Sequence, residues 1–141
     1  MIRYQAKIYK DGTRYSVEFP DLPGCFSDGA TRDEARRNAR EAMSLYLEEA
    51  RDPKWDLPRS KVRRSKRYEW VTPYEDVLIP LLIRQERRRH GLTQKELAKR
   101  IGITFQQLQK LETPGKSNPT VKTLVTISEA LGENIDIRLA A

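Results

Sequence analysis

The residues with the clearest chemical potential lie in a short polar segment near position 105. A glutamine side chain can bond both polar groups on an adenine edge, a lysine can donate to guanine, and a phenylalanine can contact a thymine methyl group. The segment offers these residue types in close succession, and it contains no carboxylate before Glu112 that would repel phosphate. Its candidate DNA-binding residues are Thr104, Phe105, Gln106, Gln107 and Lys110.

Two short helices must position this segment. Thr93 can cap the first helix, because Glu96 three positions later completes the pattern of a capping box. Gly102 gives the following turn a residue that tolerates positive φ, and Thr104 can cap the second helix. The sequence therefore predicts a helix-turn-helix, with its helices over residues 93–101 and 104–111.

A longer helix is expected before this pair and another after it. Thr72 and Glu75 form a second capping-box pattern with a proline between them, so a helix should begin there and end near His90. Pro80 lies inside that helix and should kink or split it, because proline lacks the amide hydrogen that a helix interior needs. The last helix is expected over residues 120–131.

The stretch from about Leu81 to Leu131 resembles the Cro/lambda-repressor-like (Xre-type) helix-turn-helix family. The resemblance includes the pattern L-T-Q-x-E-L-A-x-x-I-G, which ends at Gly102, and T-L-x-x-I-x-x-A-L-G, which ends at Gly132. It implies that Gln94 contacts phosphate and that the loop near Lys116 meets the DNA backbone, although this turn is one residue longer than in the family. The residues that it places at the bases are Phe105, Gln106 and Lys110.

The first fifty residues have the pattern of a small sheet covered by one helix. Apolar residues alternate over residues 4–8 and 15–19, and the intervening Asp11-Gly12 dipeptide favours a hairpin. A third short strand is expected over residues 25–27. Thr31 then caps a helix that ends near residue 51, and residues 68–71 are a candidate fourth strand.

This part of the chain, residues 2 to about 71, resembles the HicB antitoxin family. The resemblance is carried by F-P-D-L-P-G-C at residues 19–25 and G-x-T-x-x-E-A at residues 29–35. It implies a partial RNase H-like β-β-β-α-β fold that covers a HicA-type toxin, a small mRNA-cleaving protein. It also implies that a C-terminal DNA-binding domain represses the operon. Carboxylates suit a basic RNA-binding partner and apolar loop residues can anchor it, so the candidate toxin-binding residues are Asp21, Leu22, Pro23, Phe26 and Asp28.

The expected fold class is α+β, with a HicB-like domain over residues 1–58 and the strand at 68–71. A lambda-repressor-like all-α domain is expected over residues 72–141. Residues 59–67 form a linker whose six positive charges favour an extended or mobile segment, which either follows phosphates or is a plain tether. The charge supports two modules, because residues 1–56 have a net charge of −1 and residues 57–141 one of +8. The second module therefore suits a polyanion.

The composition excludes several kinds of site and a membrane-spanning segment. A single cysteine and a single histidine exclude an intramolecular disulfide, a cysteine-rich zinc site and a multi-histidine metal site, and we expect no cofactor and a cytoplasmic protein. The longest nearly apolar run, residues 77–83, is too short to span a bilayer. Alternating apolar residues over 135–139 predict a last strand and, through it, a homodimer or higher homo-oligomer.

The preferred function is a non-enzymatic antitoxin that also represses its own operon. Two alternatives remain open. One is a stand-alone repressor that responds to a ligand. The other is a metal-dependent, RNase H-like nuclease, for which converging carboxylates would come from Asp11, Glu18, Asp21 and Glu34.

Overall fold

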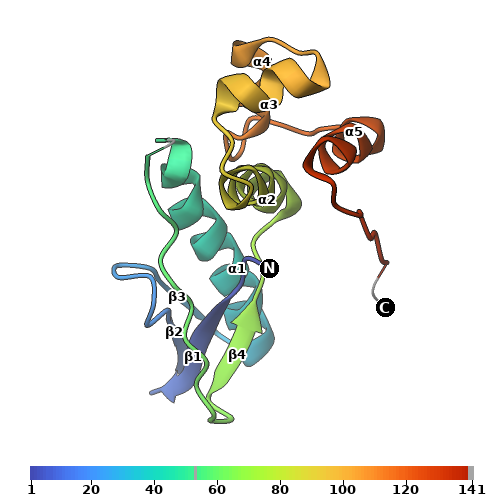
Figure 1. Ribbon diagram of the computed structural model, residues 1–141. Helices are drawn as coiled ribbons and strands as arrows, with labels where there is room; N and C mark the ends of the chain where they lie inside the picture. Colours follow the sequence, from blue (N-terminus) through green and yellow to red (C-terminus); the bar gives the residue numbers. More distant parts are fainter. Residues whose placement is uncertain (53, 140–141) are drawn as a thin grey trace.

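The N-terminal half is a four-stranded antiparallel sheet with one helix packed across one face (Figure 1). The computed structural model describes residues 1–52 and 54–139. Helix α1 (Arg32–Glu48) follows the first three strands and leads into a short 3-10 helix, η1 (Glu49–Arg51). The order of these elements along the chain confirms the predicted β-β-β-α-β succession, and in the sheet the strands lie in the order β3-β2-β1-β4. They are β1 (Tyr4–Asp11), β2 (Arg14–Glu18), β3 (Phe26–Gly29) and β4 (Tyr68–Val71).

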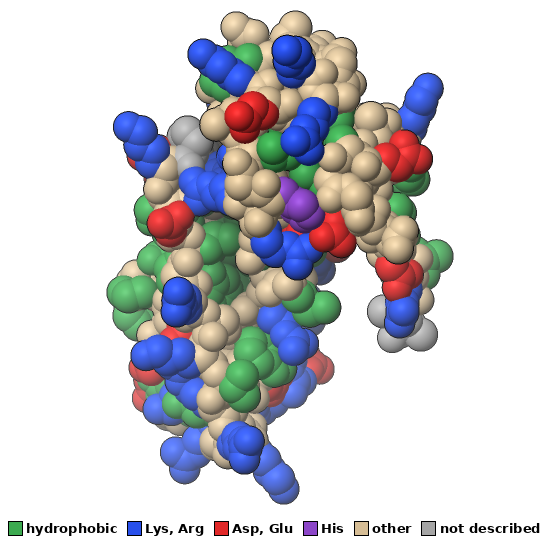
Figure 2. Space-filling view, viewed as in Figure 1, with side chains coloured by type: hydrophobic (Ala, Val, Ile, Leu, Met, Phe, Trp, Pro, Cys, Tyr) green, Lys and Arg blue, Asp and Glu red, His purple; other side chains and the backbone are tan. Residues whose placement is uncertain are grey.

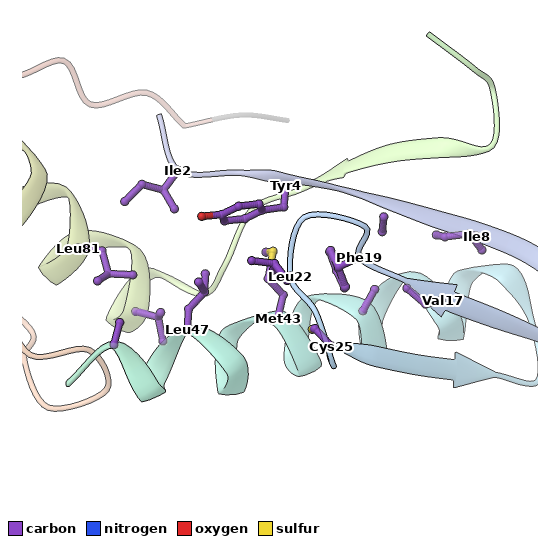
Figure 3. Close-up of a cluster of buried hydrophobic side chains, with 14 of the residues drawn as sticks. Ile2, Tyr4, Ile8, Val17, Phe19, Leu22, Cys25, Met43, Leu47 and Leu81 are labelled. Carbon is purple, nitrogen blue, oxygen red and sulfur yellow. The ribbon is translucent and has the colours of Figure 1, made fainter. Parts of the chain in front are cut away.

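Side-chain alternation places one face of the sheet against α1 (Figure 3). Tyr4, Ala6 and Ile8 of β1 are buried there, together with Val17 of β2. Helix α1 presents small residues, so the two layers approach closely: a Cβ atom added to Gly29 would lie 2.4 Å from the backbone nitrogen of Ala35. The α1 residues buried in this core are Ala35, Ala39, Met43 and Leu47.

The C-terminal half consists of four helices around a second core (Figure 1). They are α2 (Glu75–Arg89), α3 (Gln94–Ile101), α4 (Phe105–Leu111) and α5 (Val121–Leu131). The threonines expected to cap the last three helices do so, at Thr93, Thr104 and Thr120. Over residues 1–52 and 54–139, none of the helices is long and apolar enough to cross a bilayer.

Helix α2 contributes side chains to both cores. Val77 and Leu81 are buried with the sheet and α1, whereas Ile83 is buried with α3, α4 and α5. Arg84 reinforces the junction, because its guanidinium donates to the carbonyl of Glu112 at 2.9 Å and to the carbonyl of Asp52 at 3.5 Å. The C-terminal domain was expected to begin at residue 72. The helix that follows this boundary, α2, packs in the cores of both halves.

The start and the interior of α2 differ from the prediction. The N-cap is Tyr74 and not Thr72, because the backbone N–H of Tyr74 donates to the hydroxyl of Ser44 on α1 at 2.9 Å. The helix is not split at Pro80. The carbonyl of Asp76, which proline leaves without its helical donor, accepts instead from the N–H of Gly115 at 2.9 Å. A contact from a distant loop therefore accommodates this proline.

The segment near the C-terminus also departs from expectation. Residues 134–139 have no regular secondary structure, so the strand expected over 135–139 is absent from this chain. A strand needs a partner for its backbone groups, and no described strand lies beside this segment. The basic linker is held against the sheet: the N–H of Arg63 donates to the side chain of Gln5 at 2.6 Å, and Gln5 donates back to the carbonyl of Arg63 at 3.2 Å.

Candidate functional site

Helices α3 and α4 form the helix-turn-helix unit, and a capping box fixes the start of each. The Thr93 hydroxyl accepts from the N–H of Glu96 at 3.2 Å, and the Glu96 carboxylate accepts from the N–H of Thr93 at 2.8 Å. Thr104 and Gln107 repeat this exchange at 3.1 and 2.8 Å. The Glu96 carboxylate has a lowered pKa because it accepts that backbone hydrogen bond. These reciprocal bonds fix where each helix begins.

The position of α4 depends on packing, because a helix of seven residues is too short to persist alone in water. Leu108 on α4 is fully buried against Leu97 and Ala98 of α3. The small side chain of Ala98 lets the two helices approach closely. Gly102 turns the chain between them with a φ of 73°, a conformation that other residues rarely adopt.

A buried ion pair ties the end of α4 to α2 and α3. The carboxylate of Glu112 is 1% exposed and accepts from Arg87 Nε at 2.5 Å and from Arg87 Nη2 at 3.0 Å. The side-chain amide of Gln94 donates to the same carboxylate at 2.8 Å. Because both charges are out of water, removing one partner would leave the other unpaired, which is strongly destabilising.

The opposite face of α4 is open to solvent. Gln106, Gln109 and Lys110 are exposed, and Phe105 is half-buried beneath the amine of Lys95, which lies 5.7 Å from the ring centroid. This face thus carries amide and ammonium groups together with one aromatic edge. These are the groups that can bond base edges and a thymine methyl.

A groove of about 380 Å³ runs between α4 and the loop that precedes α5. It brings together three of the candidate DNA-binding residues, Gln107 and Lys110 of α4 and Lys116 of the loop. Asn118 adds a further polar side chain. Two ammonium groups beside a protruding helix suit the phosphates that border a DNA groove.

The seven candidate DNA-binding residues therefore fall into two groups, those whose side chains are exposed and those whose side chains already bond other residues. Gln106, Lys110 and Lys116 are exposed, and Phe105 lies at the edge of the same face. Thr104 and Gln107 cap α4, so their hydroxyl and amide oxygens are already engaged. Gln94 lies at the start of α3 with its amide bonded to Glu112. Sequence reasoning missed Arg87 and Glu112, the pair that supports this arrangement.

The loop expected to meet a toxin is only partly available. Leu22 is fully buried in the N-terminal core, and Asp21 forms a two-pronged pair with Arg63 of the linker, each bond 2.8 Å long. That hydrogen-bonded guanidinium lowers the pKa of the Asp21 carboxyl. Pro23 of the loop is exposed. The other two candidates lie on β3, where Phe26 is 66% exposed and Asp28 is exposed but paired with Arg14 at 2.9 Å.

The carboxylates required by a nuclease are dispersed. Glu18 accepts from the Tyr9 hydroxyl at 2.8 Å, Asp21 pairs with Arg63, and Glu34 accepts from the N–H of Ala30 at 2.7 Å. Across the described residues, none of these, nor Asp11, belongs to a group of three ligands close enough to share an ion. Cys25 offers no evident nucleophile either, since burial raises the pKa of its thiol to about 11.

Comparisons with known proteins find relatives for both halves of the chain. A helix-turn-helix family model, HTH_3, matches residues 83–137. The chain is 25% identical over 140 residues to antitoxin HicB 2 of Photorhabdus laumondii, a match that covers 96% of this chain and 95% of that protein. It is 39% identical over 59 residues to the UPF0150 protein Ta0767 of Thermoplasma acidophilum, which covers 41% of this chain and 86% of the relative.

Two further likenesses cover less. An uncharacterised 14.9 kDa protein of Haemophilus phage HP1 is 44% identical over 79 residues, and the match spans 56% of this chain but only 58% of the phage protein. A solved structure of a HicA3 and HicB3 toxin-antitoxin complex contains a chain that is 25% identical, with a TM-score of 0.42, and the match covers 52% of this chain and 99% of that one. The match to the UPF0150 protein, of which the chain covers 86%, places the chain in the UPF0150 family. The chain is also a homologue of antitoxin HicB 2 over nearly its full length and carries a C-terminal helix-turn-helix domain.

Proposed function

We propose that this protein is a cytoplasmic antitoxin that neutralises a HicA-type, mRNA-cleaving toxin and represses its own operon. The observation that carries the proposal is the union, in one chain, of a HicB-type sheet module and a capped helix α4 whose polar face is open to solvent. The first module supplies the toxin-binding surface. The second binds operator DNA.

Helix α4 is the element that enters DNA in this proposal. A major groove about 12 Å wide accepts one helix. Gln106 and Lys110 then meet base edges, while Lys116, across the groove from Lys110, meets the phosphates. The net charge of +8 over residues 57–141 favours the approach to DNA.

A pair of chains is needed for a full operator, because one helix-turn-helix reads few base pairs. The proposed contact is an apolar groove of about 760 Å³ between α2 and α5, which the C-terminal segment also lines through Ile135 and Ile137. Val121 and Ile137 are more than half exposed there. Filling this groove with a second copy would bury that apolar surface and create the two-fold axis that a palindromic operator requires.

The toxin contact is assigned to the exposed part of the loop that joins β2 and β3 and to the exposed side chains of β3 itself. Pro23 and Phe26 supply apolar surface, and Asp28 supplies charge for a basic partner. Leu22 and Asp21 hold the loop in place and do not contact the toxin in this proposal. Leu22 anchors the loop in the core and Asp21 fastens it to the linker through Arg63.

Co-expression with the toxin tests the proposal. The full chain is produced together with the product of the neighbouring reading frame, which the proposal expects to be a small basic protein. Growth, co-purification and repression of a reporter behind the upstream DNA of the gene are measured together. We expect restored growth, a stable complex and repression. The Phe26→Glu variant should lose the complex and the growth rescue but keep repression, because its helix-turn-helix is unchanged.

The matched control is Val62→Glu, which places the same charge on another exposed apolar residue, 73% exposed and in the linker. This variant should behave as the parent does. Loss of rescue in both variants, or in neither, would remove the start of β3 from the toxin-binding surface. A parent chain that neither rescues growth nor represses the reporter would refute the proposed function.

A further inference from the structure

A cluster of metal-ligating side chains lies where α2 ends and the C-terminal segment begins. Glu86 and His90 are one helical turn apart at the end of α2, and Glu133 follows Gly132, the C-cap of α5. One ligand atom from each of Glu86, His90 and Glu133 lies within 4.8 Å of the other two. Figure 2 shows the purple histidine side chain at the surface beside red acidic and blue basic side chains.

His90 and Glu133 already have the separation of two ligands on one ion. His90 Nε2 lies 3.2 Å from Glu133 Oε1. In a tetrahedral zinc site, bonds of about 2.0–2.1 Å place neighbouring ligand atoms about 3.3 Å apart. Imidazole with carboxylates is also a donor set that zinc accepts.

The hydrogen bond on the other side of the ring favours this use of Nε2. His90 Nδ1 lies 2.9 Å from the backbone carbonyl of Glu86. A carbonyl only accepts, so Nδ1 carries the hydrogen, and in a neutral ring Nε2 then holds a bare lone pair. That lone pair faces the Glu133 carboxylate, so an ion between them would have one ligand atom on each side. Histidines that ligate metals commonly make the same Nδ1–H bond to a carbonyl.

Glu86 offers a third ligand atom. Its Oε2 atom is buried and accepts no hydrogen bond from the described residues, although Arg89 Nη2 lies 2.9 Å away as an ion pair. Arg89 Nη2 also donates to Glu133 Oε1 at 2.6 Å. This guanidinium neutralises both carboxylates, and because its side chain is 60% exposed it can turn into solvent when an ion enters.

We propose that Glu86, His90 and Glu133 form a binding site for Zn²⁺, with solvent completing the coordination. The ion ties the residue after α5 to the end of α2. Glu86 and Glu133 also line the apolar groove between these helices, so the ion fixes one end of that groove and the direction in which residues 134–139 leave it. The site rests on its own geometry and holds whether or not the chain binds a toxin or DNA.

Nuclear magnetic resonance of the imidazole tests the site directly, because His90 is the only histidine in the chain. Zn²⁺ is titrated into the untagged full-length protein about one pH unit above the usual histidine pKa of about 6.5. We expect the Nε2 signal to move from the unprotonated to the metal-bound range and to saturate at one ion per chain. Mg²⁺ should leave it unchanged, because that ion prefers oxygen ligands.

Two isosteric variants keep the histidine signal and separate the site from general surface charge. Glu133→Gln should weaken Zn²⁺ binding at least about tenfold. Glu129→Gln, an exposed position one turn earlier on α5, should leave it unchanged. Zn²⁺ should also raise the unfolding temperature of the parent and of Glu129→Gln more than that of Glu133→Gln, since a ligand of the native state stabilises it. An Nε2 signal that ignores excess Zn²⁺, or equal affinity in Glu133→Gln and the parent, overturns the proposal.

Discussion

Gln106 and Lys110 are the α4 residues on which the proposed DNA reading depends. Both are exposed, and neither side chain makes a hydrogen bond or ion pair with another residue that the structure describes. Their neighbours Thr104 and Gln107 use their oxygens to cap the helix. Gln106 and Lys110 thus keep all of their hydrogen-bonding capacity for a partner.

Replacing either residue with alanine should weaken specific operator binding without affecting folding. We expect Gln106→Ala and Lys110→Ala each to cost ~1–3 kcal/mol for the lost base contact. The measurement is the affinity for DNA upstream of the gene, compared with an unrelated duplex, at two salt concentrations. The free energy of unfolding should stay within about 0.5 kcal/mol of the parent, because both side chains are on the surface.

Lys10→Ala is the control for Lys110→Ala, since it removes an equal charge from the exposed end of β1, on the half of the molecule away from α4 (Figure 1). It should leave the difference between operator and unrelated DNA unchanged. Full operator affinity in both α4 variants would contradict the assignment of α4 as the reading helix.

For single residues, the spacing of apolar and polar side chains predicts which of them are exposed. It does not predict contacts between residues that are far apart in the sequence. The exposure of Gln106 and Lys110 could be predicted, because one helical turn separates them and Leu108 takes the inner face. The partner of Gln94 could not be predicted, because Glu112 is eighteen positions away and only the packed fold brings the two together. Leu22 was misplaced for a similar reason, since a turn-forming sequence does not reveal that one side chain points into the core.

Among the elements, α4 is the one most dependent on its ends. It has seven residues, and its N-terminal amides are satisfied by Thr104 and Gln107. Thr104→Ala should therefore lower the free energy of unfolding by about 1 kcal/mol and weaken operator binding, because the start of α4 frays. Denaturant unfolding and operator titration measure the two effects.

The Thr104→Ser variant retains the hydroxyl and should restore both properties to nearly parental values. An alanine variant as stable as the parent would show that the capping box contributes nothing to α4. A serine variant that is stable but binds DNA poorly would assign the threonine methyl group to the DNA contact.

The elements also show where sequence patterns suffice. Thr93, Thr104 and Thr120 were predictable as caps because each bonds within its own first turn. The start of α2 was not, because Tyr74 is held by Ser44 from another helix. Alternating apolar residues over 135–139 indicated a strand, but alternation cannot provide the neighbouring strand that such a segment requires.

For the whole molecule, the proposed dimer is the property that connects the groove between α2 and α5 with the operator. Ile137 lines this groove and is 58% exposed in the single chain. Ile137→Lys should weaken dimerisation at least about tenfold, or ~1.4 kcal/mol, because a charge would enter an apolar contact. Sedimentation equilibrium measures the association, and a two-half-site operator should bind less tightly in parallel.

Val62→Lys makes the same substitution at an exposed apolar residue of the linker and should leave association unchanged. A parent chain that remains monomeric at micromolar concentration would contradict the dimer. So would an Ile137→Lys variant that associates as tightly as the Val62→Lys control.

Helix α2 limits how recombination can exchange one half of this protein for another. Val77 and Leu81 of this helix belong to the core between the sheet and α1, whereas Ile83 belongs to the core of the C-terminal half, which carries the helix-turn-helix. A recombination event that joined a new reading domain at residue 72 would remove Val77 and Leu81 and open a hole under the sheet. A crossover after α2 would instead strip the reading domain of Ile83 and of the arginine that neutralises Glu112. Genetic exchange is therefore constrained to replace the two halves together, or to supply a helix that fits both.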